Sequence, residues 1–446
     1  MSAKTLVLNV VGLTPRLLEH APNLRRLANE TGVRPLIPPT PAVTCTSQTT
    51  MLTGTPPSAH GIVGNGWYDR ADAEVKFWKQ SDGLVQRPRV WDALAGVTCA
   101  NLFWWYAMYC GAEVTVTPRP MYPADGRKLP DVWTNPVELR DLLQRRLGQF
   151  PLFNFWGPMA NIRSTRWIAD AAIEVDQRYG CDVTLVYLPH LDYPLQKFGP
   201  DDRRIPAEVA AVDAECAKLL EHFGDAQVLV VSEYGIESVS TPVHLNRVLR
   251  RKGWLAVREE LGRELLDAGA SRAFAVADHQ VAHVYADESV WSDAAEVLLA
   301  TEGVAEVLIG SGRSAVGLDH ERAGDLVVLA EPGAWFTYYY WLDDRKAPDF
   351  APTVDIHRKP GYDPAELFLD PNLRLPQLKV ARKLLAKKAG LRALLDVIPI
   401  DASCVKGSHG LQPTSASVGP LMIGNGDGDA LPMTDVADVI RAAALR

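Results

Sequence analysis

Residues 41–62 read Pro-Ala-Val-Thr-Cys-Thr-Ser-Gln-Thr-Thr-Met-Leu-Thr-Gly-Thr-Pro-Pro-Ser-Ala-His-Gly-Ile. Thr44 follows Pro41 by three residues and precedes a Ser/Thr-rich turn and an apolar run. That run closes in Thr-Gly, and a Pro-x-x-His-Gly-Ile signature then ends at Ile62. A lone threonine would be explained as a turn hydroxyl, but this combination of residues at fixed spacing is specific.

The composition is that of a globular enzyme. The chain has 446 residues, of which 47% are hydrophobic and 22% charged, so it can bury a sizeable core. A net charge of -8 and an isoelectric point near 5.7 argue against a protein that binds nucleic acid or an anionic membrane. A local basic pocket for a phosphorylated small molecule remains compatible with this charge.

The compartment is predicted from the N-terminus and the cysteines. The chain passes from Met1 straight into a strand-like run, without the apolar region or cleavage site of a signal peptide. No apolar stretch approaches about 18 residues, so we expect no membrane span. Six cysteines are scattered without C-x-x-C spacing, as is typical of reduced thiols. We expect a cytoplasmic protein.

Buried-strand patterns alternate with helical patterns along the chain. Continuous apolar runs at Leu6–Val11, Val183–Leu188 and Val228–Val231 indicate strands that are buried on both faces. Helical stretches such as Leu17–Thr31 and Ile205–Phe223 lie between them. This alternation predicts a mostly parallel sheet with helices on both faces, and functional groups at the carboxyl ends of the strands.

Changes in pattern suggest the domain organisation. We expect an α/β core over residues 1–240, in which the Trp-, Tyr- and Pro-rich stretch 101–158 is insertion-like and could wall a pocket. Residues 241–323 are expected to form a smaller, cap-like subdomain with a strand at Val281–Tyr285. Residues 324–446 are expected to complete the core, beginning with a further core strand.

The stretch 41–62 resembles the nucleophile segment of the type I phosphodiesterase/nucleotide pyrophosphatase branch of the alkaline phosphatase superfamily, with Thr44 at the nucleophile position. The resemblance implies an alkaline-phosphatase-like three-layer α/β/α sandwich with a mostly parallel sheet. It also implies phosphoryl transfer assisted by two zinc-like ions, which Asp and His hold at strand ends. Ser47 is then a candidate substrate contact.

The first two metal motifs of the family are altered here. The family's first strand ends in Asp-Gly, whereas this chain has Val11 before Gly12, and a valine cannot bind a cation. The second motif is Asp-x-x-x-His, and this chain keeps the aspartate as Asp192 but replaces the histidine by Gln196. We therefore treat Asp192 as a candidate metal ligand and Gln196 as a candidate substrate contact.

The third motif is also altered, while the last is intact. Ser-Asp-His-Gly becomes Ser-Glu-Tyr-Gly, which places Glu233 and Tyr234 at the ligand positions as candidate acid–base groups. Glutamate can still offer oxygens to a metal, but a neutral tyrosine is a poor zinc ligand. Gly-x-His-Gly is retained around His409. The candidate metal ligands are thus Asp192, His409 and Glu233.

These replacements predict zero or one divalent ion, zinc or manganese, rather than two. Zinc generally takes roughly three or four protein ligands, and Asp192 with His409 would supply only half of one site. His190, two residues before Asp192, is available to a metal or to the substrate, because side chains at i and i+2 of a strand point the same way.

Cationic side chains elsewhere are candidate phosphate contacts. Residues 355–363 contain His357, a candidate base, and Arg358 and Lys359, candidate substrate contacts. Arg119 is a further candidate that could replace lost metal charge. The alternative is that both groups are solvated turns or surface charges. His279 and His283 are four apart, but they surround a strand-like run, so we do not expect a metal pair there.

Three functions remain open from the sequence. The first is an enzyme that acts on a specialised phosphorylated small molecule. The second is a family member that has lost hydrolysis and serves as a binding or pathway-assembly protein. The third is a metal-independent reaction in the same pocket. A weaker resemblance, to the phosphodiesterase-like member of bacterial secondary-metabolism gene clusters with a prenyltransferase and a sugar-phosphate cyclase, implies a prenylated or cyclitol phosphate. The oligomeric state is not predicted.

Overall fold

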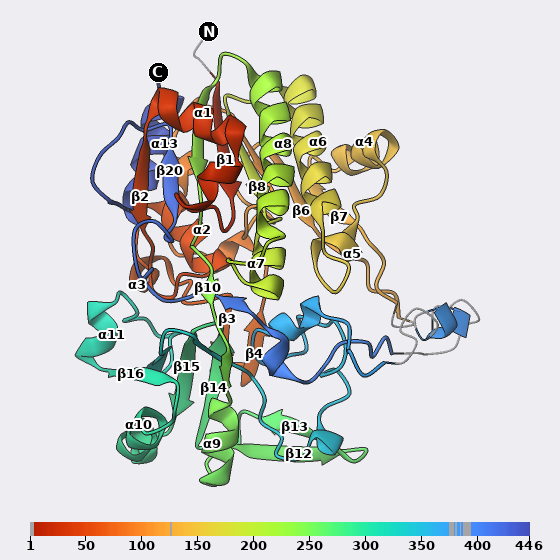
Figure 1. The fold of residues 1–446 in the computed structure, drawn as a ribbon, viewed down its shortest axis with the longest axis vertical. Coiled ribbons are helices and arrows are strands. Elements are labelled where there is room, and N and C mark those ends of the chain that lie inside the picture. Colours follow the sequence, from red (N-terminus) through yellow and green to blue (C-terminus); the bar gives the residue numbers. More distant parts are fainter. Residues whose placement is uncertain (1–3, 125–126, 374–378, 380, 384, 387–393) are drawn as a thin grey trace.

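A nine-stranded mixed sheet forms the centre of the protein in the computed structural model, which describes residues 4–124, 127–373, 379, 381–383, 385–386 and 394–446 (Figure 1). In sheet order the strands are β21 (Leu431–Pro432), β2 (Val33–Ile37), β20 (Leu421–Ile423), β9 (Gln227–Val231), β1 (Thr5–Val10), β8 (Val183–Leu188), β5 (Cys99–Leu102), β6 (Val114–Pro118) and β7 (Val132–Asn135).

The middle of this sheet is parallel. β1 pairs in parallel with both β8 and β9, so that Thr5 lies opposite Val183 on one side and Gln227 on the other. β5 continues the parallel part to β6, whereas β20 and β7 run antiparallel to their neighbours. Every residue of β1 and β8 is buried, as expected for strands covered on both faces. The predicted mostly parallel sheet is confirmed.

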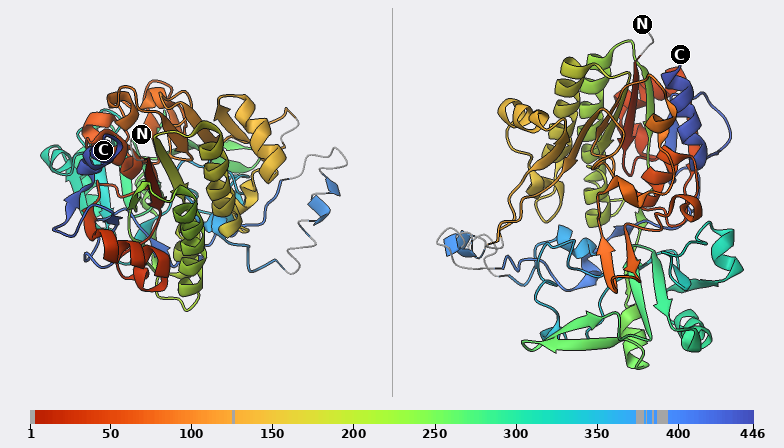
Figure 2. Two further views of the ribbon diagram at one scale, coloured as in Figure 1. Left: turned by 90° about the horizontal axis from the view of Figure 1, so that it is seen from above. Right: turned by 180° about the vertical axis from the view of Figure 1, so that it is seen from behind.

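Helices cover both faces of the sheet, which gives three layers (Figures 1 and 2). On one face α6 (Ile162–Tyr179) and α8 (Ile205–Phe223) pack against each other and against strands β8 and β1, with α1 (Pro22–Thr31) beside α8. On the other face α13 (Val436–Ala444) contacts β1 and α2 (Thr44–Thr53). The predicted three-layer α/β/α architecture is confirmed.

A second, antiparallel sheet lies below the first in Figure 1 and has its own hydrophobic core. Its order is β14 (Ala273–Asp278), β15 (Val281–Ala286), β17 (Leu326–Ala330) and β16 (Val304–Ile309). α9 (Leu245–Arg251) and α10 (Trp291–Leu299) pack on it. β15 is the strand that was expected at Val281–Tyr285.

Within the described part of the chain, four two-stranded pairs and several short helices accompany the two sheets. The strand pairs are β3 (Gly66–Asp69) with β4 (Glu74–Phe77), β10 (Glu237–Ser238) with β19 (Gly407–Ser408), β11 (Thr241–Val243) with β18 (Ala334–Phe336), and β12 (Ala256–Glu260) with β13 (Arg263–Asp267). Further helices are α3 (Pro57–His60), α4 (Glu138–Leu147), α5 (Leu152–Phe155), α7 (Asp192–Phe198) and α11 (Ser311–Ala315).

The sheet topology bears on two expectations about organisation. Residues 101–158, expected to be insertion-like, supply the strands β6 and β7 at one edge of the main sheet. The run after Gly324 forms β17 in the smaller sheet, and the chain returns to the main sheet only at β20. An apolar run shows that a strand is buried, but it does not show which sheet the strand joins. The exact domain boundaries stay predictions.

The carboxyl ends of β1, β8 and β9 meet at the edge of the main sheet that faces the smaller sheet (Figure 1). α7 begins after β8, and the motif of Glu233 follows β9. Among the described residues, no helix has the length and apolar character needed to cross a membrane.

Candidate active site

Thr44 is the first residue of α2, the helix that follows an extended residue, Val43, and ends at Gly54 in the left-handed conformation. All ten residues of this helix are buried, and Thr44 is only 5% exposed. The Thr44 hydroxyl oxygen lies 3.1 Å from the hydroxyl oxygen of Tyr234. The threonine is therefore held at the positive end of a helix dipole, in contact with the third motif.

Asp192 and Gln196 lie one turn apart on α7 and share one face of it. Tyr234 donates its hydroxyl proton to Asp192 Oδ1 over 3.1 Å, and the Gln196 amide donates to Oδ2 over 2.8 Å. Because the Tyr234 proton is directed at Asp192, its oxygen is free to accept a proton from Thr44. Thr44, Tyr234 and Asp192 thus form one hydrogen-bonded chain.

Glu233 follows β9 and is fully buried. Its Oε1 accepts hydrogen bonds from the side-chain amides of Asn9 and Gln48, each at 2.6 Å, while Oε2 has no hydrogen-bond partner among the described residues. Burial raises the pKa of Glu233 to about 8, and the bonds from Gln48 and Asn9 offset only part of this shift. Glu233 is thus mostly protonated at neutral pH.

Burial also raises the pKa of Asp192, to about 7, against the lowering effect of the bonds from Tyr234 and Gln196. In the part of the chain that the structure describes, no ion pair joins a Lys or Arg to Asp192 or Glu233. Neutral O–H and N–H donors, rather than cations, therefore contact both carboxyl groups.

His409 follows β19 and stacks face to face on Tyr234, with ring centroids 3.5 Å apart and planes within 6°. Its Nδ1 lies 2.7 Å from the carbonyl oxygen of Ala42, which can only accept, so Nδ1 carries the proton. Burial lowers the pKa of His409 well below its usual value, which leaves Nε2 as a bare acceptor. This Nε2 is 3.8 Å from Asp192 Oδ1.

The donor set does not fit a two-metal centre. Across the described ranges, no group of three or more His, Cys, Asp or Glu side chains could hold a metal ion. Asp192 and His409 form a pair without a third ligand, and Glu233 is engaged by two amides. Val11 is completely buried and offers no donor. Zinc sites use roughly three or four protein ligands.

The structure thus brings together six of the predicted site residues: Thr44, Asp192, Gln196, Glu233, Tyr234 and His409. Ser47 lies in the same buried helix, three residues after Thr44, and its hydroxyl has no partner among the described residues. The roles of these residues remain predictions.

Other predicted residues have contacts of a different kind. His190 is buried, and its Nε2 is 2.7 Å from Glu208 on α8. Arg119, His357 and Arg358 are exposed. His357 contacts Tyr122 at 6.5 Å between ring centroids, and Arg358 lies 3.8 Å from Asp349.

Lys359 is buried rather than presented to a ligand. Its ammonium nitrogen lies 2.7 Å from both Asp363 and Glu366. These two carboxylates raise the pKa of Lys359 against the opposing effect of burial. The cation is therefore balanced inside its own cluster, and its proposed contact with substrate stays a prediction.

Several residues of the site were missed by the sequence reasoning. Asn65 accepts from the backbone amide of Cys45 at 2.9 Å and so fixes the peptide next to Thr44. Asn9 is a lone polar residue inside an apolar strand, and Gln48 lies one helical turn after Thr44. These two patterns were signals in the sequence, because a buried polar side chain requires a partner.

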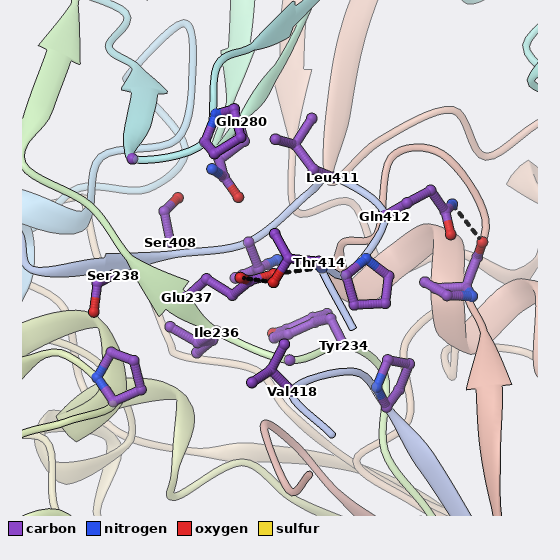
Figure 3. Close-up of a pocket in the computed structure, with 18 of the residues that line it drawn as sticks. Tyr234, Ile236, Glu237, Ser238, Gln280, Ser408, Leu411, Gln412, Thr414 and Val418 are labelled. Carbon is purple, nitrogen blue, oxygen red and sulfur yellow. Dashed lines mark hydrogen bonds between the residues drawn. The ribbon is translucent and has the colours of Figure 1, made fainter. Parts of the chain in front are cut away.

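A cavity of about 300 Å³ borders the outer side of this cluster (Figure 3). Tyr234 and His409 line it, whereas Thr44, Asp192 and Glu233 do not. Figure 3 shows Glu237 bound to Thr414 in its wall, with Gln280 and Ser408 on the opposite side. Tyr234 thus lines the cavity and also contacts the candidate nucleophile.

Solved structures with the same fold include phosphonoacetate hydrolase from Sinorhizobium meliloti in complex with phosphonoformate, at 15% identity and a TM-score of 0.63 over 100% of this chain and 96% of that chain. Murine ectonucleotide pyrophosphatase/phosphodiesterase 5, in complex with AMP, matches at 13% identity and a TM-score of 0.59 over 100% and 95%. The human protein of the same name matches at 12% identity and a TM-score of 0.58, over 99% of this chain and 95% of that chain.

The sequence comparisons agree with the fold. None of the curated proteins matches the chain. The family described as type I phosphodiesterase / nucleotide pyrophosphatase matches residues 5–363, which include every motif discussed above except the one around His409. With its alkaline-phosphatase-like fold, the chain belongs to the type I phosphodiesterase/nucleotide pyrophosphatase family.

Proposed function

We propose that this protein is an enzyme that acts on the phosphoester of a specialised small molecule, with Thr44 as its nucleophile and at most one divalent ion. The observation that supports this most is the chain of hydrogen bonds from Thr44 through Tyr234 to Asp192, with 3.1 Å at each step. Such a chain can remove the threonine proton, which is the task that a metal ion performs for an activated hydroxyl.

The proposed step proceeds as follows. The Thr44 oxygen attacks phosphorus with its lone pair, and the bond from phosphorus to the leaving oxygen breaks with its electron pair. The Thr44 proton moves to Tyr234 as the Tyr234 proton moves to Asp192, and solvent protonates the leaving oxygen. When water later attacks phosphorus, the Thr44 oxygen leaves and recovers its proton by the reverse path, while water releases a proton to solvent.

The amino end of α2 supplies part of the stabilisation that a phosphoryl group needs. Thr44 is the first residue of this ten-residue helix, whose dipole favours negative charge at that end. Asn65 fixes the adjacent amide of Cys45. Without two cations, however, the developing charge loses several kcal/mol of stabilisation. We therefore expect generic phosphodiesters to be turned over poorly, and rate to depend on binding energy from the rest of the substrate.

The second candidate is a binding or assembly protein without turnover. The observation that favours it is the closed site, in which Thr44 is 5% and Asp192 8% exposed. A protein of this kind would bind a phosphorylated ligand without consuming it. Phosphonoacetate hydrolase and ectonucleotide pyrophosphatase/phosphodiesterase 5 have complexes with phosphonoformate and AMP respectively, so both ligands are suitable probes.

A panel of phosphorylated compounds tests the proposed function. It would contain bis-p-nitrophenyl phosphate, AMP, nucleotide sugars, and prenyl and cyclitol phosphates, with products followed by phosphorus NMR. We expect turnover of a specialised member that Thr44→Ala lowers by at least about a hundredfold. Thr49→Ala is the matched control, because among the described residues its hydroxyl binds only the Cys45 carbonyl within the same buried helix.

Two results would contradict the proposal. Turnover that survives Thr44→Ala would remove the nucleophile assignment. Binding of panel members, measured by calorimetry, with no turnover of any of them would favour the binding protein.

A further inference from the structure

Four aromatic rings form a continuous stack beside Thr44. Tyr234 lies on His409 at 3.5 Å between centroids, His409 on His279 at 3.7 Å, and His279 on Tyr362 at 3.6 Å. All four are buried, with at most 4% exposure. Separations of this size are van der Waals contacts, so no ion or water fits between the ring faces.

Both ends of this stack are tied to the same pair of side chains. Tyr234 donates to Asp192, and Tyr362 donates to the Gln196 amide oxygen over 2.9 Å. Gln196 in turn donates to Asp192. The contacts therefore close on themselves and form what we call the contact ring, whose members are Tyr234, His409, His279, Tyr362, Gln196 and Asp192.

Gln196 and Tyr234 occupy positions where the family pattern has metal-binding histidines. In the contact ring each supplies a proton to one oxygen of Asp192, so the carboxyl group is satisfied without a cation. Gln196 uses both ends of its amide, because its nitrogen donates to Asp192 while its oxygen accepts from Tyr362. The replacements are thus matched to each other rather than independent losses.

The histidines of the contact ring are not arranged as a ligand pair. The Nδ1 atom of His279 lies 2.8 Å from Asp278 Oδ1, and the Nδ1 atom of His409 contacts the Ala42 carbonyl oxygen. The Nε2 atoms of both histidines lack a hydrogen-bond partner among the described residues. A ring nitrogen binds a metal along the ring plane. The rings of His279 and His409 pack against each other at 3.7 Å between centroids with their planes tilted by 37°, and among the described residues they belong to no group of three donors that could hold a metal ion.

The contact ring also joins the two hydrophobic cores of the molecule. Tyr234 belongs to the core of the main sheet, whereas Tyr362 belongs to the core of the smaller sheet. His279 lies in the turn between β14 and β15, where its backbone has a φ of 61°. A non-glycine residue in this conformation is strained, and such strain is retained where surrounding contacts fix it.

We propose that the contact ring replaces the two-metal centre as the structural link between the two sheets, so that folding and the placement of Thr44 need no divalent ion. This goes beyond the proposed function and does not depend on it, because a catalytically inactive chain would need the same link. The proposal concerns metal content and stability, which are measured without a substrate.

The first test measures zinc by mass spectrometry in purified full-length protein, before and after incubation with zinc chloride and desalting. We expect no stoichiometric zinc and an unfolding temperature that neither EDTA nor zinc changes. The triple variant Val11→Asp/Gln196→His/Tyr234→His restores the family's donors, and we expect it to retain zinc and become sensitive to EDTA. Stoichiometric zinc in the natural protein with destabilisation by EDTA, or a folded triple variant without zinc, would overturn the proposal.

The second test removes one hydroxyl of the contact ring. Tyr362→Phe leaves the Gln196 oxygen unsatisfied, and we expect the unfolding temperature to fall by about 1–3 °C. Tyr338→Phe is the matched control, since Tyr338 is fully buried nearby and its hydroxyl has no partner among the described residues. Equal effects of the two substitutions would show that the contact ring does not act as a link.

Discussion

At the scale of single residues, the site is defined by how neutral donors replace cations. Asn9 and Gln48 bind one oxygen of Glu233, and Tyr234 and Gln196 bind both oxygens of Asp192. Hydrogen bonds satisfy a carboxyl group without the charge of a metal ion, but they do not prevent burial from favouring its protonated form. The ionisation of these groups is therefore coupled to folding.

The pH dependence of stability follows from Glu233. Its pKa rises from 4.5 to about 8 on folding, so the folded protein binds the extra proton. The stabilisation of the folded state by this proton is complete below pH 4.5 and is lost as the pH rises to about 8. We expect the unfolding temperature to fall over this interval, and to fall less steeply in Glu233→Gln. Glu221→Gln, at an exposed position of α8, is the control; identical slopes in all three proteins would contradict the expectation.

At the scale of elements, the backbone of strand β19 lies very close to the backbone of helix α7. Gly407 of β19 lies so near α7 that an added Cβ would meet the Leu195 carbonyl oxygen at 2.3 Å. Leu195 lies between Asp192 and Gln196 in α7, so its contact with β19 helps to position both side chains. The Gly-x-His-Gly pattern thus places His409 and also permits the approach of α7.

Gly407→Ala should therefore disturb the site as well as the fold. We expect it to destabilise the protein by about 1–3 kcal/mol, because a backbone atom must move to admit the methyl group. Chemical denaturation measures this cost. Gly83→Ala is the control, since its Cβ would meet only Ser81 Oγ at 3.7 Å. A Gly407→Ala protein as stable as Gly83→Ala would mean that α7 and β19 move apart freely.

At the scale of the whole molecule, the sequence predicts the main sheet well and the site only in part. The apolar runs of β1, β8 and β9 identify parallel strands, and their polar ends identify Asp192 and Glu233. The contact ring could not be predicted, because His279 comes from a turn of the smaller sheet and Tyr362 from a loop in the core beside that sheet. The periodicity of a sequence does not show how one hydrophobic core packs against another. The altered motifs show which metal ligands are missing, but they do not show which side chains contact each other instead.

The central claim is that Thr44 still acts as a nucleophile at a site without two metals. The most direct test is mass spectrometry of EDTA-treated protein, quenched with acid during turnover of the best substrate from the panel. We expect a mass gain equal to the phosphoryl part of the substrate, located on the peptide that contains Thr44 and absent in Thr44→Ala. Turnover with no adduct on Thr44, or loss of both adduct and turnover in EDTA with recovery only when two zinc ions bind each chain, would contradict this assignment.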